Sequence, residues 1–389
     1  IAVIIAALVG FYVVRDSQFV RESPSLARLR NISWEDDTTK ARFYIWQMAL
    51  EGFKERPVFG WGPENFAVVF SKHFDPRLWK QEPWFDRAHN AVFDWLTAGG
   101  IFGLLSYLGI FISAAWLLIR KFKERKISNL EVSVFFGLLA AYFFQNLFVF
   151  DQLTSYLLIF GVLGYIHFVT LNVSPQSALK AGPWVSRGAS RVWITVLLVA
   201  LVASLYFLNL KPLFANISLL DALQSASAGK YQETQDNFRS AIGLSSLGRR
   251  EAREQYAYFA TLIAGREDVP ESFRLSVINE AIRETKMQIE DSPLDARSYL
   301  FLSSVYNAAG RRAEALAAAE KALELSPKKQ QIIFFVAQFY LDSQLPEKAI
   351  ELATLGARRD PNYPDAQHNL VNLAIQAGRD DLALEGIKN

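Results

Sequence analysis

Long stretches of apolar residues constrain this chain more than any other feature of its sequence. A helix needs about 20 residues to cross about 30 Å of hydrocarbon. Four stretches reach that length, at residues 92–119, 132–150, 153–171 and 192–210. A fifth, at residues 1–14, is shorter and has neither a basic lead-in nor a cleavage site, so we interpret it as part of a further span. The sequence therefore predicts a multi-pass helical membrane domain over residues 1–210.

The two ends of the chain suggest that it is a piece of a longer protein. It begins with Ile1 inside an apolar stretch rather than with a methionine. It ends at Asn389 within a helical repeat, without the polar capping helix that repeat arrays use. We therefore expect an N-terminal part of the membrane domain to be missing.

Basic residues mark two short loops between the predicted spans. Five lysines and arginines lie between Arg120 and Lys126, and Lys180, Arg187 and Arg191 precede the last span. The positive-inside rule predicts that both loops are cytoplasmic. The segment 15–90, which we call the outer segment, the Asp151–Gln152 turn and the region after residue 210 are then extracytoplasmic.

The region from residue 215 to residue 389 carries a repeat with a period of 34 residues. Two copies, 296–329 and 330–363, are clear, a partial third occupies 364–389, and residues 215–293 are helical but degenerate. Small residues at the helix crossing and a proline after the second helix resemble tetratricopeptide repeats, which stack into an α-solenoid. Tyr299, Leu302, Tyr306, Gly310, Ala315, Ala322 and Pro327 are matched 34 positions later by Ile333, Val336, Tyr340, Gln344, Ala349, Gly356 and Pro361. The predicted fold class is thus all-α, a membrane domain followed by a solenoid.

Composition and missing motifs exclude several classes of function. The net charge is +2, and the basic residues do not gather into a face interleaved with aromatics, which argues against nucleic-acid binding. The absence of cysteine excludes disulfides, thiolate metal sites and cysteine nucleophiles. No metalloprotease, phosphate-loop, dinucleotide or serine-hydrolase motif is present in the sequence, so hydrolase, ATPase and oxidoreductase functions lack support, and we assign no cofactor.

The outer segment carries the chemistry-bearing groups. Arg42 and Trp46 are four residues apart, Gly60-Trp61-Gly62 follows, and Asp86-Arg87-Ala88-His89-Asn90 directly precedes a span. Arginine holds phosphate bidentately, and a histidine titrating near pH ~6.5 can move a proton. The pattern favours a reaction on a lipid-linked phosphate at the membrane surface.

The order and spacing of these motifs resemble the O-antigen ligase and polymerase superfamily over about residues 40–170. The motifs are Arg42-x3-Trp46, Pro57-x2-Gly60-Trp61-Gly62, Asn65-Phe66, Ala88-His89-Asn90, Gly100-x2-Gly103 and Tyr107. The resemblance implies a fold of the GT-C type in the bacterial inner membrane. It also implies metal-independent transfer of a glycan from undecaprenyl pyrophosphate to a hydroxyl acceptor that is a lipid, a glycan or a protein. Ligase, polymerase and protein O-oligosaccharyltransferase remain open.

The resemblance also implies roles for single residues. His89 matches the family's loop histidine and would take or orient the acceptor proton, while Arg42 would hold phosphate. The expected substrate-binding residues are Arg87, Asp86, Trp61, Asn65 and Asn90. His73 is a competing base, and the polar cluster Gln145, Asn146, Asp151 and Gln152 either packs helices together or faces the same pocket.

A membrane-anchored scaffold without catalysis is the alternative to this transferase. In a scaffold the spans only tether the repeats, which bind a protein partner, and neither His89 nor Arg42 is needed. A transporter is a third possibility, but the visible spans carry few of the midplane charges that transporters use. Membrane lipids and a protein partner for the repeats are expected in either main hypothesis.

Overall fold

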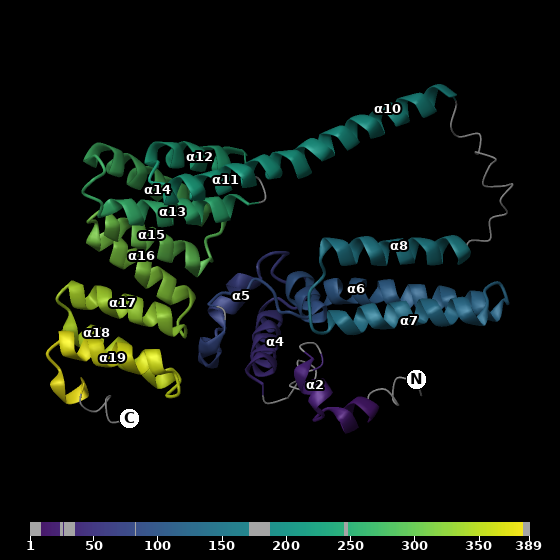
Figure 1. Ribbon diagram of the computed structural model, residues 1–389, viewed down its shortest axis with the longest axis horizontal. Helices are drawn as coiled ribbons and strands as arrows, with labels where there is room; N and C mark the ends of the chain where they lie inside the picture. The colour runs from purple at the N-terminus through teal and green to yellow at the C-terminus, as the bar shows by residue number, and fades with distance from the viewer. Residues whose placement is uncertain are drawn as a thin grey trace.

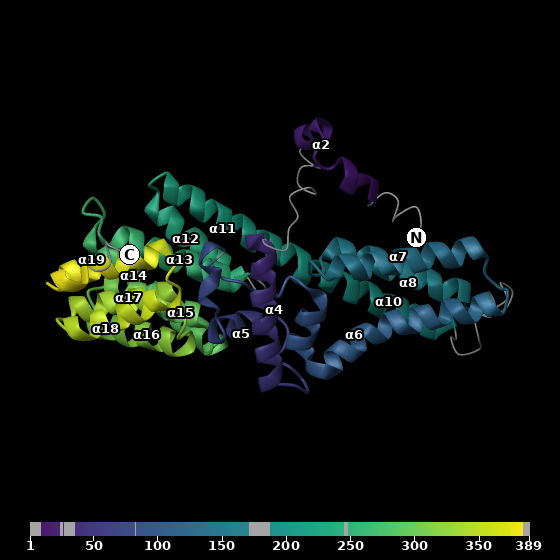
Figure 2. The ribbon, with the colours of Figure 1, turned by 90° about the horizontal axis from the view of Figure 1, so that it is seen from below.

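The computed structural model describes residues 9–23, 26, 36–81, 83–170, 187–244 and 248–383, and the regular secondary structure of these residues is helical throughout. Apolar membrane-type helices lie at one end of the molecule and paired helices at the other, with part of the outer segment between them (Figure 1, Figure 2). The predicted all-α class, with apolar helices followed by repeats, is confirmed.

Three antiparallel helices form the bundle next to the outer segment: α6 (Ala91–Lys123), α7 (Asn129–Asn146) and α8 (Leu153–Thr170). A fourth long helix stands apart from them (Figure 1). It comprises α10 (Arg187–Ser204), the π-helical turn η2 (Leu205–Leu210) and α11 (Lys211–Ser227). In the described part of the chain, three stretches are long and apolar enough to cross a membrane: Ala91–Lys123, Leu153–Thr170 and Val192–Ser227.

Two predicted spans have different ends in the structure. The span 132–150 corresponds to α7, which starts at Asn129 and stops at Asn146, and which is not among the three stretches just named. Polar residues shorten it, because Glu131 caps its start with Ser128 and its last residues turn toward α8. The span 192–210 continues as helix to Ser227. Residues 1–8 of the first span and the loop that holds Lys180 lie outside the described residues.

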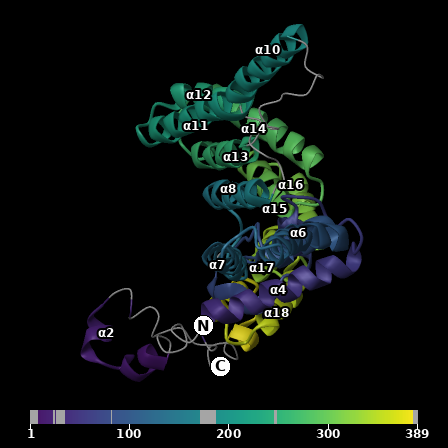
Figure 3. The ribbon, with the colours of Figure 1, turned by 90° about the vertical axis from the view of Figure 1, so that its right-hand side faces the viewer.

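The described part of the outer segment is mostly helical. It contains α2 (Gln18–Glu22), α4 (Asp37–Glu55), α5 (Phe66–Lys72) and the 3-10 helix η1 (Pro76–Lys80). Helix α2 lies away from the rest of the molecule (Figure 3). The remaining three elements share an apolar core that includes Ile45, Phe70 and Leu78, each almost fully buried. This core fixes the outer segment on the end of the bundle where α6 begins.

The C-terminal region is a stack of antiparallel helix pairs with tetratricopeptide-like geometry. Gly356 lies on the partner helix of Ile333, and a Cβ added there would come within 2.8 Å of the Ile333 side chain, which explains why the crossing needs a small residue. Residues of the degenerate region 215–293 form further pairs of the same kind. The pairs are α11 with α12 (Tyr231–Leu244), α13 (Arg249–Ala264) with α14 (Glu271–Asp291), α15 (Ala296–Ala308) with α16 (Arg312–Leu325), and α17 (Gln330–Asp342) with α18 (Pro346–Arg359), followed by α19 (Pro364–Gln376).

The repeats are docked on the outer segment. The Ser326 hydroxyl donates to the Ser71 carbonyl at 2.8 Å, and the buried Lys329 ammonium donates to the Pro83 carbonyl. Trp84 packs against the core of the repeats. These contacts come from the turns between repeats, so the array meets the outer segment with one edge.

Candidate functional site

The glycine-rich turn of the outer segment is joined to a kink in α6. Gly100 has φ +61° and ψ −154°, a conformation that only glycine adopts readily. The kink exposes backbone groups to the turn: Trp61 N–H donates to Thr97 O at 2.8 Å, Gly62 N–H to Ala98 O at 2.9 Å, and Ile101 N–H to Pro57 O at 2.8 Å. The two glycine motifs of the sequence, around residues 60 and 100, therefore build one structural unit.

The start of α6 is held by two further contacts. Trp46 on α4 donates its indole N–H to Ala88 O at 3.1 Å and stacks on Phe93 with 5.4 Å between ring centroids. Asn90 caps α6 by accepting from the N–H groups of Val92 and Phe93, and its amide donates to Leu147 O at 2.9 Å. Asn90 is 4 % exposed. It therefore acts as a helix cap that also ties α6 to the α7–α8 turn, and it contributes no group to the pocket described next.

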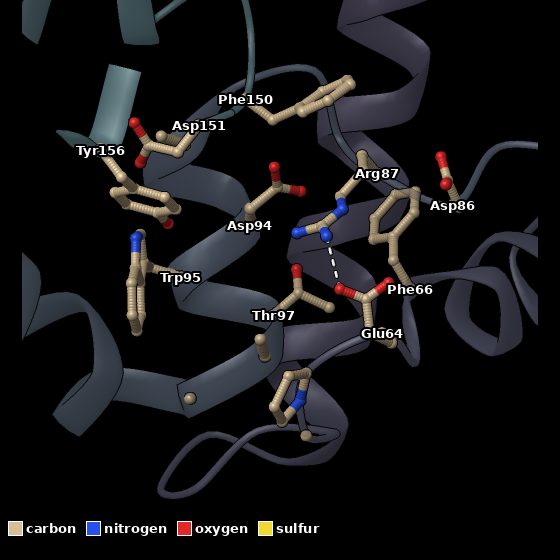
Figure 4. Close-up of a pocket in the computed structure, with 15 residues that line it drawn as sticks. Glu64, Phe66, Asp86, Arg87, Asp94, Trp95, Thr97, Phe150, Asp151 and Tyr156 are labelled. Atoms are coloured by element: carbon tan, nitrogen blue, oxygen red, sulfur yellow. Dashed lines mark hydrogen bonds and ion pairs between the residues drawn. The ribbon is translucent and has the colours of Figure 1, made fainter. Parts of the chain in front are cut away.

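A pocket of about 370 Å³ lies where the glycine-rich turn, the residues before α6, the first turns of α6 and the α7–α8 turn meet (Figure 4). Its volume is within the roughly 300–1,000 Å³ typical of small-molecule sites. It is lined by Gly62, Pro63, Glu64, Phe66, Asp86, Arg87, Ala91, Asp94, Trp95, Thr97, Ala98, Gly99, Phe150, Asp151 and Tyr156. Two of the predicted substrate-binding residues, Asp86 and Arg87, are therefore in the pocket.

Charge is unevenly distributed in this pocket. The Arg87 guanidinium is paired with Glu64, a residue held at φ +63° on the more exposed side. The other charged lining residues are the carboxylates of Asp86, Asp94 and Asp151. Four carboxylates against one guanidinium make the described pocket acidic, with a single cationic point at Arg87.

His89 lies beside the pocket rather than among its lining residues. Its ring meets Phe85 and Phe150 edge-on, with centroids 5.5 Å and 5.4 Å away, and Phe150 itself lines the pocket. The backbone of His89 has φ +53°, a left-handed conformation that few residues other than glycine adopt, although asparagine, aspartate and histidine do so more often than the rest. Such a strained position next to a pocket is typical of functional sites.

Arg42 is half-buried on α4, one helical turn before Trp46. The i,i+4 spacing puts it on the helix face that contacts Ala88. It does not line the pocket, and among the described residues its guanidinium has no ion-pair partner. Arg42 thus lies one helical turn from the Trp46–Ala88 contact, and His89 directly follows Ala88 in the chain.

Trp61 and Asn65 hold the glycine-rich turn together. The Trp61 indole donates to Gly52 O at 2.8 Å, and the Arg56 guanidinium lies 4.0 Å from its ring centroid. Asn65 donates to Trp61 O at 2.8 Å. Neither side chain lines the pocket. In the structure both residues make packing or turn-forming contacts, and their contacts with substrate stay a prediction.

The structure also bears on the alternative base His73 and on the polar cluster that includes Asn146 and Asp151. His73 is 2.8 Å from Glu55 on the far side of the outer segment and does not line the pocket. Asn146 donates to Tyr107 and to Asp151, a packing contact, yet Asp151 also lines the pocket. The cluster therefore packs helices together through Asn146 and also lines the pocket through Asp151.

Asp94 and Thr97 are lining residues that sequence reasoning did not select. Asp94 stands five residues after His89, and in the sequence it is a single charged residue at the start of an apolar stretch. An ionisable residue in a membrane helix is itself a signal, because burying it there is costly. Thr97 gives no such signal, since it lines the pocket next to a kink at Gly100 that the sequence does not reveal.

Comparison with known proteins gives a family for the first part of the chain. The model of the O-antigen ligase family (Wzy_C) matches residues 1–108. This range covers the outer segment and the first half of α6, and it ends before residue 170, where we had expected the resemblance to end. The chain thus has an O-antigen ligase domain followed by tetratricopeptide-like repeats.

The remaining matches are to repeat proteins. The Hsp70-Hsp90 organizing protein of Triticum aestivum is 30 % identical over 147 residues, which are 35 % of this chain and 24 % of that protein. Crystal structures of MamA (TM-score 0.34, 16 % identity, 43 % of this chain and 90 % of that one) and of the type IV pilus biogenesis factor PilW (TM-score 0.34, 16 % identity, 51 % and 84 %) are also similar. The chain spans about a quarter of the length of the curated relative.

Proposed function

We propose that this protein transfers a glycan from an undecaprenyl-pyrophosphate carrier to a hydroxyl acceptor, without a metal ion, in the pocket between the outer segment and the bundle. The observation that carries the proposal is the position of this pocket. At this pocket Arg87, two residues before His89, lies close to the start of the apolar helix α6. This part of the chain is within the region that matches the O-antigen ligase family. A lipid-linked donor would reach such a place from the membrane.

The reaction needs a cation and a base. The acceptor oxygen forms a bond to the anomeric carbon while the bond from that carbon to the carrier phosphate breaks, and the electron pair leaves with the pyrophosphate. Arg87, with Arg42 behind it on α4, would stabilise the charge that builds on the phosphate oxygens. His89 would accept the hydroxyl proton after a movement of its ring past Phe150, which it now contacts.

The arrangement of the helices supports an extracytoplasmic site in the bacterial inner membrane. The pocket, the Asp151–Gln152 turn and the repeats all lie toward one end of α6, α7 and α8 (Figure 1), whereas the basic residues that follow α6 lie at the other. The positive-inside rule assigns the basic end to the cytoplasm. We propose that the repeats bind a protein partner on the outer side, close to the site on which they dock.

The decisive experiment is transfer by the protein in proteoliposomes, with an undecaprenyl-pyrophosphate glycan and no added nucleotide or metal. His89→Asn is the best variant, because asparagine tolerates positive φ but cannot act as a base near neutral pH. We expect it to lower the rate at least 100-fold, the scale of general-base catalysis. His73→Ala is the matched control and should transfer at the parental rate.

The outcomes separate the two hypotheses. Loss of transfer in His89→Asn with parental membrane insertion and thermal stability supports the transferase and the role of His89. Equal rates in the parent and His89→Asn would move the base elsewhere. No transfer by the parent with any donor would favour the scaffold, in which the docked repeats keep their partner in both variants.

A further inference from the structure

The pocket has two chemically different ends. Arg87 and Glu64 form the exposed end, where the side chains are 35 % and 69 % exposed. Asp94, Thr97 and Asp151, with Trp95 and Tyr156 beside them, line the part of the pocket formed by α6 and the α7–α8 turn, and the Arg87 guanidinium points toward Asp94 (Figure 4). We refer to these five residues as the acidic end. Nothing in the roles proposed so far for donor phosphate and base uses it.

Each aspartate of the acidic end has one oxygen fixed by the protein. Asp94 Oδ1 accepts from Ala88 N–H at 2.7 Å. Asp151 Oδ1 accepts from the amide of Asn146 at 2.8 Å and from the Tyr142 hydroxyl. These contacts set the orientation of the two carboxylates from two elements: the residues before α6 hold Asp94, and α7 holds Asp151.

The second oxygen of each carboxylate is buried and has no hydrogen-bond partner among the described residues. The same holds for the hydroxyl of Thr97, which is 2 % exposed. A buried polar atom without a partner costs about 1–3 kcal/mol, so native structures rarely leave one. Three such atoms lining one pocket indicate that a ligand completes them.

The chemistry of these atoms selects the ligand. Carboxylate oxygens accept hydrogen bonds and repel anions, so a phosphate does not suit the acidic end, whereas a group with several O–H donors does. The Trp95 ring, 37 % exposed and stacked on Tyr107 at 5.6 Å, offers an apolar face next to these acceptors. A sugar ring presents both matching surfaces, hydroxyls at its edge and C–H groups on its face.

We propose that the acidic end is the subsite for the acceptor, that this acceptor is a neutral sugar, and that Asp94, Asp151 and Thr97 position it by accepting hydrogen bonds from its ring hydroxyls. The inference rests on the glycan transfer proposed above and divides the pocket between the two substrates. The donor phosphate contacts Arg87, and the acceptor lies against α6 and the α7–α8 turn. Among the possible products this favours a glycan joined to a glycan over a glycan joined to a protein.

Direct binding tests the subsite without any turnover. The full chain in nanodiscs, without donor, would be titrated with methyl glucoside, methyl N-acetylglucosaminide and methyl glucuronide, and binding followed by saturation-transfer NMR. We expect the two neutral glycosides to bind and the glucuronide to bind at least fivefold more weakly. Asp94→Asn with Asp151→Asn should weaken neutral-sugar binding at least fivefold, while Glu51→Gln, on the exposed surface of α4, should not.

A second pair of variants guards against misfolding. Thr97→Ser keeps a hydroxyl in the acidic end, and Thr97→Val replaces that hydroxyl with a methyl group of similar size. Thr97→Ser should bind neutral glycosides like the parent, and Thr97→Val should bind them more weakly. Absence of sugar binding by the parent, or equal binding by the parent, Thr97→Val and the double aspartate variant, would overturn the proposal.

Transfer kinetics then distinguish the subsite from the reaction. If both proposals hold, the aspartate variants raise the KM for the acceptor at least fivefold and leave the KM for the donor unchanged. A rise in the KM for the donor alone would overturn the acceptor subsite while the transferase stands. Sugar binding that depends on the acidic end, in a parent that transfers no glycan, would support the subsite and reject the transfer.

Discussion

Trp79 of the outer segment stacks on Tyr363 of the repeats, with ring centroids 4.8 Å apart and planes 13° from parallel. The Trp79 indole also donates to Asp360 at 3.1 Å. Trp79 precedes the pocket residues Asp86 and Arg87 by only a few positions, so the repeats are fixed to the same chain segment that enters the site. A partner bound to the repeats would therefore be held near the substrates.

The stacked pair should contribute measurably to this docking. Aromatic pairs of this geometry contribute about 0.5–1.5 kcal/mol beyond their buried area. We expect Trp79→Ala and Tyr363→Ala each to destabilise the full chain, and the double variant to be more stable than the sum predicts by about that energy. Thermal unfolding of the four proteins measures the coupling, and strictly additive effects would show that the pair does not interact.

Lys329 makes the docking depend on pH. Its side chain is 1 % exposed, and its ammonium lies 4.0 Å from the Trp84 ring centroid. Burial, and then the charge of Arg297, lower the pKa of Lys329 to about 7, against about 10.4 in an unfolded chain. Between these values the unfolded state binds more protons, so the free energy of unfolding should rise with pH from about 7 to about 10, by up to about 1.4 kcal/mol per pH unit.

Replacing this lysine isolates its contribution. Lys329→Met keeps a side chain of similar length without a titrating group, so its stability should rise less steeply than that of the parent over this pH range. Lys328→Met, at the exposed neighbouring position, is the control and should keep the parental slope. Chemical denaturation at several pH values gives the slopes, and identical slopes for all three proteins would refute a depressed pKa at Lys329.

Gly100 should tolerate no side chain. Its backbone conformation is restricted to glycine, and a Cβ there would approach Val58 O to 2.4 Å. We expect Gly100→Ala to cost at least about 2 kcal/mol, from the left-handed backbone and the clash together, and to abolish transfer by separating the glycine-rich turn from α6. Gly109→Ala in the same helix meets nothing within 4 Å and should be harmless. A Gly100→Ala protein that melts and transfers like the parent would show that the kink is dispensable.

Features set by local pattern could be predicted from the sequence. The apolar length of α6 and α8 identifies both as spanning helices, and the 34-residue period places the crossing of α17 and α18 at Gly356. Proximity in sequence also placed Asp86 and Arg87 at the site. In each case the signal lies within a few turns of helix or within one repeat.

Features that depend on contacts between distant segments could not be predicted from the sequence. Thr97 reaches the pocket only because the turn around residue 60 pairs with the kinked α6. Asp94 and Asp151 converge because Asn90 binds the α7–α8 turn. Trp79 packs on Tyr363, a partner more than 280 residues away along the chain. Such pairings depend on three-dimensional shape, which one sequence does not display.

The repeats themselves carry one position where the sequence departs from what the backbone requires. Gly310 and Gly378 occupy the turn between the helices of their repeats with φ +71° and +70°. The corresponding position 34 residues after Gly310 is Gln344, which has the same left-handed backbone at φ +60°. A left-handed conformation costs a non-glycine residue roughly 1–2 kcal/mol, and glycine loses about 0.5–1 kcal/mol more backbone entropy on folding.

We therefore expect Gln344→Gly to stabilise the repeats by about 0.5–1 kcal/mol, the difference between these two terms. Gly310→Gln should destabilise them by a similar amount, because it introduces the same strain in the preceding repeat. Hydrogen exchange of α17 and α18, measured on the full chain together with its thermal midpoint, reports the change where it occurs. A lower midpoint for Gln344→Gly would contradict the prediction and mean that the entropy cost of glycine, together with any lost contact of the glutamine side chain, outweighs the relief of the left-handed backbone.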